Sequence, residues 1–237
     1  MNLENIPVLT ILTFLPILGA FVLVFLPKEN PQLIRFTALT IAALEFVISV
    51  PLFFLFNSKT HAMQFVERFA WFPEAGISYS VGIDGISLLL VLLTTFLTLI
   101  CIPAMWTAID KQIKEFLICL LFLETGMVGV FVSLDLFLFY VFWEVMLIPM
   151  YLMIGVWGGS RRIYASIKFF IYTMAGSVLM LAGILVLYYI QYRQKGIFSF
   201  DIASFQQLAL DPVTEVWLFL AFFIAFAIKV PMFPVHT

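Results

Sequence analysis

The 237-residue sequence has few charged residues and only two cysteines. Charged side chains make up 11% of it and the formal net charge is −2, which is too small and too scattered for a nucleic-acid partner. Cys101 and Cys119 stand apart, with no CxxC or cysteine–histidine cluster, so neither a disulfide framework nor a metal site is indicated. Glycine-rich nucleotide-binding motifs are also missing. We therefore expect no nucleotide, flavin, haem or iron–sulfur cofactor in this chain.

Apolar residues are in excess instead. Hydrophobic residues form 64% of the chain, its mean hydropathy is +1.13, and phenylalanine alone occurs 28 times. No soluble core of this size needs so much apolar surface, so lipid is the expected solvent. Charge-poor runs long enough to cross a bilayer occur seven times. We predict an all-α integral membrane protein with about seven transmembrane helices, near Val8–Leu26, Phe36–Phe56, Ile86–Trp106, Phe116–Val132, Leu136–Trp157, Ala165–Ile190 and from Val216 onward.

Two polar stretches interrupt these runs. Residues 57–85 combine glycine, proline and tryptophan and predict a structured extramembrane loop. Residues 191–215 predict an interfacial amphipathic piece followed by a turn at Asp211 and Pro212. Asp84 and Asp135 each stand just before an apolar run, where an acid favours the N-terminus of a helix.

The positive charges predict an orientation. The short connections between helices 1 and 2, 3 and 4, and 5 and 6 hold six basic residues, whereas the N-terminal tail and the turn between helices 4 and 5 hold none. Because basic short loops stay in the cytoplasm, we expect the N-terminus on the periplasmic side. The six residues are Lys28, Arg35, Lys111, Lys114, Arg161 and Arg162.

Glu144 lies in the middle of the apolar run 136–157. A carboxylate at that depth costs roughly 2.5 kcal/mol or more unless a partner or water meets it, so intramembrane acids indicate a functional site. On a continuous helix, Tyr140, Ile148 and Tyr151 would share its face. The competing interpretation is a protonated carboxyl group with a purely structural hydrogen bond.

Lys229 is the one base deep in an apolar run, and Pro231 and Pro234 follow it. The prolines predict a helix interrupted in the membrane, and a lysine there can exchange its proton, unlike an arginine. A broken helix in lipid needs neighbours for its freed backbone groups, so we expect a truncated last helix and a longer native protein. Lys168, closer to the cytoplasmic rim, is either functional or reaching toward the membrane surface.

Two further acids occur in apolar runs. Glu124 stands in a segment where Gly126 and Gly129 permit close helix approach, and we include it among the candidate site residues. The role of Glu45 stays open, because an interhelical hydrogen bond explains its place in an apolar run as well as a transport role does.

The stretch FYVFWEVMLIPMYLMIGVWGG (139–159) resembles the proton-pumping antiporter-like subunits of respiratory complex I, most closely the ND4-type or M-type chains. Further similar stretches are SVGIDGISLLLVLLTTFLT (80–98), LETGMVGVFVSLDLFLFY (123–140), YASIKFFIYTMAGSVLML (164–181) and AFAIKVPMFPVHT (225–237). The resemblance implies that Glu144 and Lys229 are the family's proton-translocation pair, and that Lys168 is its sixth-helix lysine.

The same resemblance implies a membrane-arm subunit of NADH:quinone oxidoreductase in a bacterial inner membrane. It would translocate protons coupled to quinone reduction elsewhere, with FMN, iron–sulfur clusters and quinone in partner subunits. Its partners would be the other membrane subunits of complex I, including neighbouring antiporter-like ones. The resemblance also divides the chain into two parts. Residues 1–115 hold helices 1–3 and the 57–85 loop, and residues 116–237 hold helices 4–7, the incomplete start of an antiporter-like translocation unit.

Two alternatives stay open. The first is a subunit of a multisubunit Na⁺/H⁺ antiporter or of a membrane-bound hydrogenase, against which the GVWGG and VGIDGIS stretches favour complex I. The second is a scaffold without a transport role, against which Glu144 and Lys229 together argue.

Overall fold

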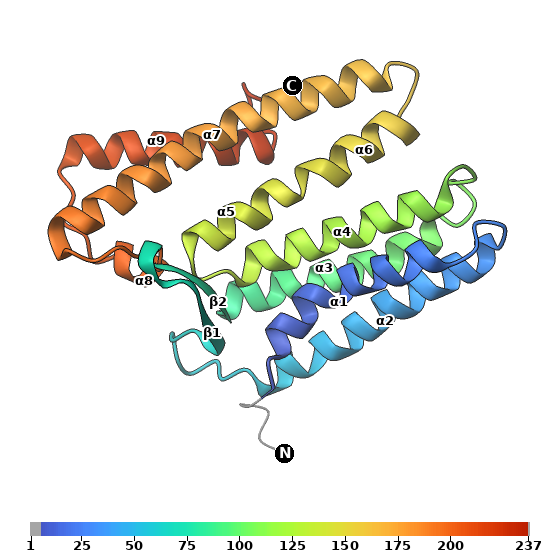
Figure 1. Ribbon diagram of the computed structural model, residues 1–237, viewed down its shortest axis with the longest axis horizontal. Coiled ribbons are helices and arrows are strands. Elements are labelled where there is room, and N and C mark those ends of the chain that lie inside the picture. The colour runs from blue at the N-terminus through green and yellow to red at the C-terminus, as the bar shows by residue number, and fades with distance from the viewer. Residues whose placement is uncertain (1–5, 237) are drawn as a thin grey trace.

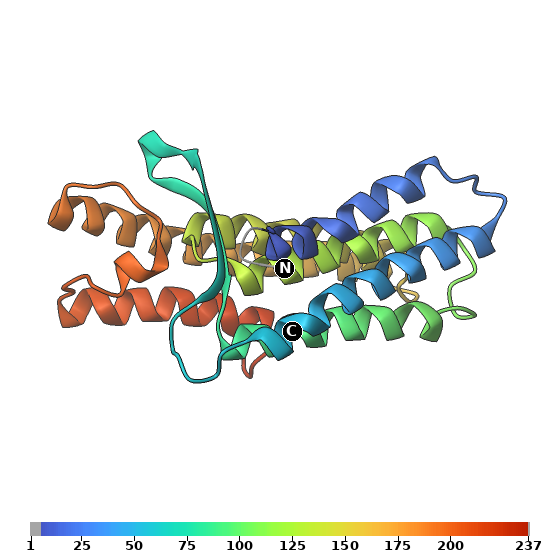
Figure 2. The ribbon, with the colours of Figure 1, turned by 90° about the horizontal axis from the view of Figure 1, so that it is seen from below.

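The computed structural model describes residues 6–236. Long helices lie side by side and nearly parallel, with a two-stranded hairpin crossing them at one end (Figures 1 and 2). The elements in chain order are α1 (Val8–Phe25), α2 (Pro31–Leu55), β1 (Gln64–Phe72), η2 (Pro73–Ala75), β2 (Ile77–Ile83), α3 (Gly85–Ala104), α4 (Ile113–Val132), α5 (Leu136–Val145), α6 (Leu147–Trp157), α7 (Arg162–Lys195), α8 (Ile202–Phe205) and α9 (Pro212–Lys229).

The predicted fold class is confirmed. Within the described residues, seven segments are long and apolar enough to span a membrane when α5 and α6, which follow one another in a line, are counted together. Three boundaries differ by four or more residues from those expected. Helix α2 begins at Pro31 rather than near Phe36. Helix α7 runs to Lys195 rather than ending near Ile190, and α9 begins at Pro212 because the Asp211 carboxylate accepts hydrogen bonds from Val213 N and Thr214 N, at 3.2 and 3.1 Å.

Helix α4 lies at the centre of the bundle. It contacts α1, α2, α3, α5 and α6, and it is the most buried of the seven spans. Gly126 and Gly129 face α5 so closely that a Cβ atom on either would lie 2.4 Å from a side-chain atom of Met146 or Phe142. The close approach expected at these glycines is therefore confirmed, and any larger residue there would separate α4 from α5.

The expected loop at 57–85 is an antiparallel hairpin, in which Arg68 pairs with Ser80. Its first strand also caps a membrane helix. The Glu67 carboxylate accepts hydrogen bonds from Leu9 N at 2.7 Å, Thr10 N at 3.1 Å and the Thr10 hydroxyl. Helix α1 has no side-chain cap of its own, so β1 provides the acceptor that its free N–H groups need.

Asp84 and Asp135 are helix N-caps, as predicted. Asp84 and Ser87 form a capping box at α3, and hydrogen bonds from the backbone, that of Ser87 N–H first, hold the pKa of Asp84 below its usual value. The Asp135 carboxylate accepts from Phe137 N and Leu138 N, at 3.0 and 3.1 Å, at the start of α5.

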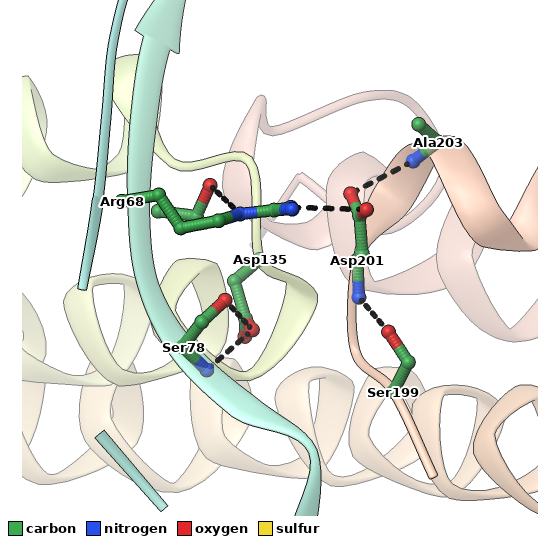
Figure 3. Close-up of polar contacts among 7 residues, drawn as sticks. Arg68, Ser78, Asp135, Ser199, Asp201 and Ala203 are labelled. Carbon is green, nitrogen blue, oxygen red and sulfur yellow. Dashed lines mark hydrogen bonds and ion pairs between the residues drawn. The ribbon is translucent and has the colours of Figure 1, made fainter. Parts of the chain in front are cut away.

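Asp135 also joins the hairpin to α5 (Figure 3). Its second carboxylate oxygen accepts from the Ser78 backbone N at 3.0 Å and the Ser78 hydroxyl at 3.1 Å, and the Asp135 side chain is fully buried. Beside it, Arg68 Nη2 lies 3.0 Å from Asp201 Oδ2, which links β1 to the segment before α8. Three parts of the chain that are distant in sequence therefore meet at one polar junction.

Aromatic rings cover the C-terminal end of α7. Tyr188 stacks on Phe200 and Tyr192 on Phe198, each pair with ring centroids 4.2 Å apart. The Tyr188 hydroxyl also donates a hydrogen bond to the Ala75 carbonyl at 3.0 Å. The rings thus fix the end of the longest helix against the segment 198–200 and the hairpin.

We predict that Asp135→Ala destabilises the full-length protein. The change leaves the Ser78, Phe137 and Leu138 N–H groups without their acceptor, which should lower the free energy of unfolding by about 2 kcal/mol or more. Thermal unfolding in detergent measures this. Asp110→Ala is the matched control, because Asp110 is exposed and makes no side-chain hydrogen bond within the described residues. Equal thermal shifts for the two variants would contradict the assignment.

Candidate functional site

Glu144 lies in the last turn of α5, directly before a break in the membrane-spanning helix. Pro149 has no N–H to give to the Val145 carbonyl, and its ring clashes with that carbonyl, so the helix is interrupted at Met146. One oxygen of the Glu144 carboxyl group is buried without a hydrogen-bond partner among the described residues. A carboxyl group with a buried oxygen that accepts no hydrogen bond is suited to receive a proton or a cation.

The predicted stripe of side chains around Glu144 includes residues on both sides of the break at Met146, whose backbone keeps right-handed helical angles. Tyr140 stays close to Glu144, and Ser177 of α7 lies against it. In contrast, Ile148 is 61% exposed, and Tyr151 packs against Phe170 with ring centroids 5.6 Å apart. Tyr140 and Tyr151 therefore both lie against α7, whereas Ile148 between them is exposed.

Lys229 ends α9, as its prolines predicted. Met232 N donates a hydrogen bond to Ala227 O at 2.8 Å in the turn that follows, where the helix is no longer regular. The end lies beside the middle of α7, because a Cβ atom on Gly176 would lie 2.8 Å from Ile228 Cδ1. The end of α9, which carries Lys229, therefore lies near the middle of the bundle's length rather than at either end of it (Figure 1).

The Lys229 ammonium group lies over an aromatic ring. Its Nζ is 4.6 Å from the centroid of the Trp143 ring, and Trp143 is itself buried and packs edge-on against Phe226. Such a contact stabilises a desolvated cation by about 2 kcal/mol. Because Trp143 precedes Glu144 in the sequence, the ring holds the ammonium group within electrostatic range of the carboxylate.

Glu144 and Lys229 are close but not directly paired. Within the described residues, the ion pairs are Lys28 with Glu115 and Arg68 with Asp201, both near the ends of the bundle. The arrangement therefore offers the lysine two partners, the ring that it now contacts and the nearby carboxylate.

A cavity of about 760 Å³ reaches this site from the end of the bundle that carries the short connections. Lys168 on α7 and Lys229 both line it, so the structure brings these two predicted residues to one space. Arg161 and Arg162, in the connection between α6 and α7, also line it. The charged lining residues in the described part of the chain are all basic, so the cavity favours an anion or a proton acceptor.

Glu124 does not join this group. It is fully buried on α4, where it lies against Glu45 of α2 and Thr98 of α3. Gly126 faces α5, and two residues correspond to about 200° of rotation around a helix, so Glu124 points to the opposite side of α4. The structure thus separates Glu124 from Glu144.

Sequence reasoning did not find two of these contacts. Trp143 precedes Glu144 in the sequence, but adjacent residues on a helix point about 100° apart. The position of Trp143 next to Glu144 therefore did not predict its contact with Lys229. Glu45 and Glu124 are 79 positions apart (124 − 45), and nothing in either segment predicts that they meet.

Comparison with known proteins agrees with this geometry. Residues 133–237, which include Glu144, Lys168 and Lys229, match the family described as NADH:quinone oxidoreductase/Mrp antiporter, transmembrane. The chain is 41% identical over 240 residues to NADH-quinone oxidoreductase subunit M of Rickettsia conorii, with 98% of this chain and 48% of that protein covered. It is 42% identical over 237 residues to NADH-ubiquinone oxidoreductase chain 4 of Chondrus crispus, covering 100% of this chain and 47% of that one. The chain spans about half the length of these relatives.

Solved structures agree as well. A chain of respiratory complex I from Thermus thermophilus with bound NADH superposes with a TM-score of 0.81 at 29% identity, covering 96% of this chain and 45% of that one. A chain of the Mrp complex from Dietzia sp. gives 0.79 at 24% identity, covering 100% and 42%, a likeness of fold alone. Over nearly its whole length, the chain is thus similar to a segment that makes up about half of the proteins named NADH-quinone oxidoreductase subunit M or NADH-ubiquinone oxidoreductase chain 4.

Proposed function

We propose that this chain is part of a membrane-arm subunit that translocates protons, driven by quinone reduction elsewhere in the complex. The observation that carries the proposal is the placing of an acid and a base, Glu144 and Lys229, at two helix interruptions inside an apolar bundle. Ionisable groups at that depth are costly and are kept where protons or ions pass.

The mechanism is a switch of the Lys229 ammonium group between two partners. At ~4 Å and an effective dielectric constant of ~20, a pair with Glu144 is worth about 4 kcal/mol. The contact with Trp143 is worth about 2 kcal/mol when desolvated, so the two arrangements differ by only a few kcal/mol. A change of charge or conformation in a neighbouring subunit is enough to shift such a balance, and the lysine then releases its proton when it leaves the carboxylate.

The basic cavity supports a direction for proton uptake. It extends from Arg161 and Arg162 to Lys229, with Lys168 along its wall. We assign Lys168 the role of the next proton acceptor in this path. Glu124, on the far side of α4, does not line this cavity.

The redox chemistry belongs to the assembly. We propose that FMN, the iron–sulfur clusters and quinone are held by partner subunits, and that this chain contacts the other membrane subunits, including neighbouring antiporter-like ones. An Mrp-type cation/proton antiporter is the second candidate. The complex I assignment is favoured because relatives about 41% identical bear that name, whereas the Mrp likeness concerns the fold.

We place the protein in a bacterial inner membrane with the hairpin on the periplasmic side. The three basic short connections lie together at one end of the bundle, and the hairpin lies at the other (Figure 1). Since basic short loops stay in the cytoplasm, this arrangement supports a periplasmic N-terminus.

The first test is Glu144→Gln in the full-length subunit within the reconstituted complex. The amide keeps the shape of the side chain and loses its charge, so the complex should assemble but lose most of its proton pumping per NADH oxidised. Glu144→Asp should lose less. Glu29→Gln, in the exposed α1–α2 connection, is the control and should pump normally. Normal pumping by correctly assembled Glu144→Gln complex would refute the proposal.

A second test removes the aromatic partner of Lys229. Trp143→Leu should favour the ion pair with Glu144 by about 5- to 30-fold, because it abolishes a contact worth 1–2 kcal/mol. Release of the lysine, and with it the pumping rate, should slow accordingly. Trp143→Phe keeps an aromatic ring, so its pumping rate should lie between that of Trp143→Leu and that of the unchanged complex. A pumping rate in Trp143→Leu equal to that of the unchanged complex would show that the ring has no such role.

A third test concerns orientation. In a background without Cys101 and Cys119, Ser58→Cys in the loop before β1 should react with a membrane-impermeant maleimide added outside intact spheroplasts. Ser160→Cys, between α6 and α7, should react only in inverted vesicles. Both serines are exposed. The reverse pattern of labelling would overturn the assigned orientation.

A further inference from the structure

A second pair of acids lies inside the bundle, away from Glu144. Glu45 on α2 and Glu124 on α4 are both fully buried and face each other. Within the described residues, none of their four carboxyl oxygens has a hydrogen-bond partner. Two adjacent carboxyl groups without a donor between them are an unusual arrangement for a protein interior, where polar groups are normally paired.

The surrounding hydroxyl groups are already engaged. Thr98 lies against Glu124, but its hydroxyl donates to the Thr94 carbonyl at 3.1 Å. Ser49, one turn from Glu45, donates to the Phe46 carbonyl at 2.7 Å and lies 3.0 Å from the Thr95 hydroxyl. These hydroxyl hydrogens serve helix carbonyls, so none of them satisfies the acids.

Among residues 6–236, no basic side chain reaches the pair either. Helices α1 and α3, which pack beside it, contain no Asp, Glu, Lys, Arg or His. Arg35 on α2 and Lys114 on α4 are each ten residues from the acid on their own helix, about 15 Å away along the axis. Both are engaged there, Arg35 with the Ile109 carbonyl and Lys114 with the Leu26 carbonyl, each at 2.8 Å.

The pair cannot carry two negative charges. Two carboxylates in contact, desolvated and without a cation, repel one another strongly, so at least one must be protonated. A single proton between them also supplies the missing hydrogen bond, since one carboxyl group then donates to the other. A second proton makes the pair neutral, and its release restores the shared state with no change in electron count.

We propose that Glu45 and Glu124 form a proton-binding pair, which holds one proton between the two carboxyl groups and exchanges a second during turnover. Thr125 supports a connection to the first site. Its hydroxyl oxygen is buried without a partner among the described residues, and it follows Glu124 by about 100° around α4, toward the face that meets α5. The role in turnover rests on the proposed function, whereas the shared proton does not.

The test uses the full-length subunit in the assembled complex, with Glu45→Gln, Glu124→Gln and the double variant. Because the proton belongs to the pair, each single variant should lower pumping several-fold and the double variant should lower it no further. Ser49→Ala, also buried on α2, should leave pumping unchanged. Unaltered pumping in both single variants, or losses that multiply in the double variant, would overturn the proposal.

Infrared spectroscopy of the resting complex separates this proposal from the function of Glu144. The wild type should show a shared-proton carboxyl signal that shifts in D₂O and is unchanged in Glu144→Gln. Each single variant should replace it with the signal of one isolated carboxylic acid, and the double variant should have neither. Absence of the signal from the wild type refutes the pair even if Glu144→Gln stops pumping. This measurement also decides the matter if a variant fails to assemble. A signal displaced by added Na⁺ would identify a metal-cation site and refute proton binding.

Discussion

Hydrocarbon provides no hydrogen bonds, and this constraint governs the whole structure. Every backbone group inside the membrane must find its partner within the protein, so the chain crosses as helices and departs from helical geometry at few places. Each departure needs a local solution. At the start of α1 the solution comes from Glu67 of a distant strand, and at the start of α5 it comes from Asp135.

The same constraint explains where the reactive groups lie. The interruptions at Met146 and after Lys229 release backbone groups and make room for a polar side chain, so an acid and a base can be placed at depth without disrupting a regular helix. Helix α4 then separates two acidic sites. Its glycines admit α5 on one face, and its fully buried glutamate meets α2 on the other. A central helix packed on all sides is suited to pass a change of charge or position from one face to the other.

Local features of the structure followed from the sequence. Apolar runs located the spans, Pro231 and Pro234 located the interruption after Lys229, and Asp84 and Asp135 marked helix starts, because each of these effects acts within a few residues. The contacts between helices did not follow. The capping of α1 by Glu67, the contact of Lys229 with Trp143 and the meeting of Glu45 with Glu124 depend on how helices rotate against one another. The helical periodicity of a single sequence does not determine how each helix is rotated against its neighbours.

The length of α7 has a consequence for how the protein sits in lipid. At 1.5 Å per residue its 34 residues extend about 51 Å, whereas the hydrocarbon layer of a bilayer is about 30 Å thick. Even strongly tilted, the helix must therefore end in the headgroup region. Its last turns carry the stacked rings of Tyr188 and Tyr192, followed by Arg193 and Lys195. Tyrosines and basic residues are the side chains that favour the membrane–water boundary. The tyrosines and basic residues at this end of α7 thus anchor the helix at the membrane–water boundary. This anchoring sets the depth of the bundle in the bilayer and keeps the hairpin at the water surface.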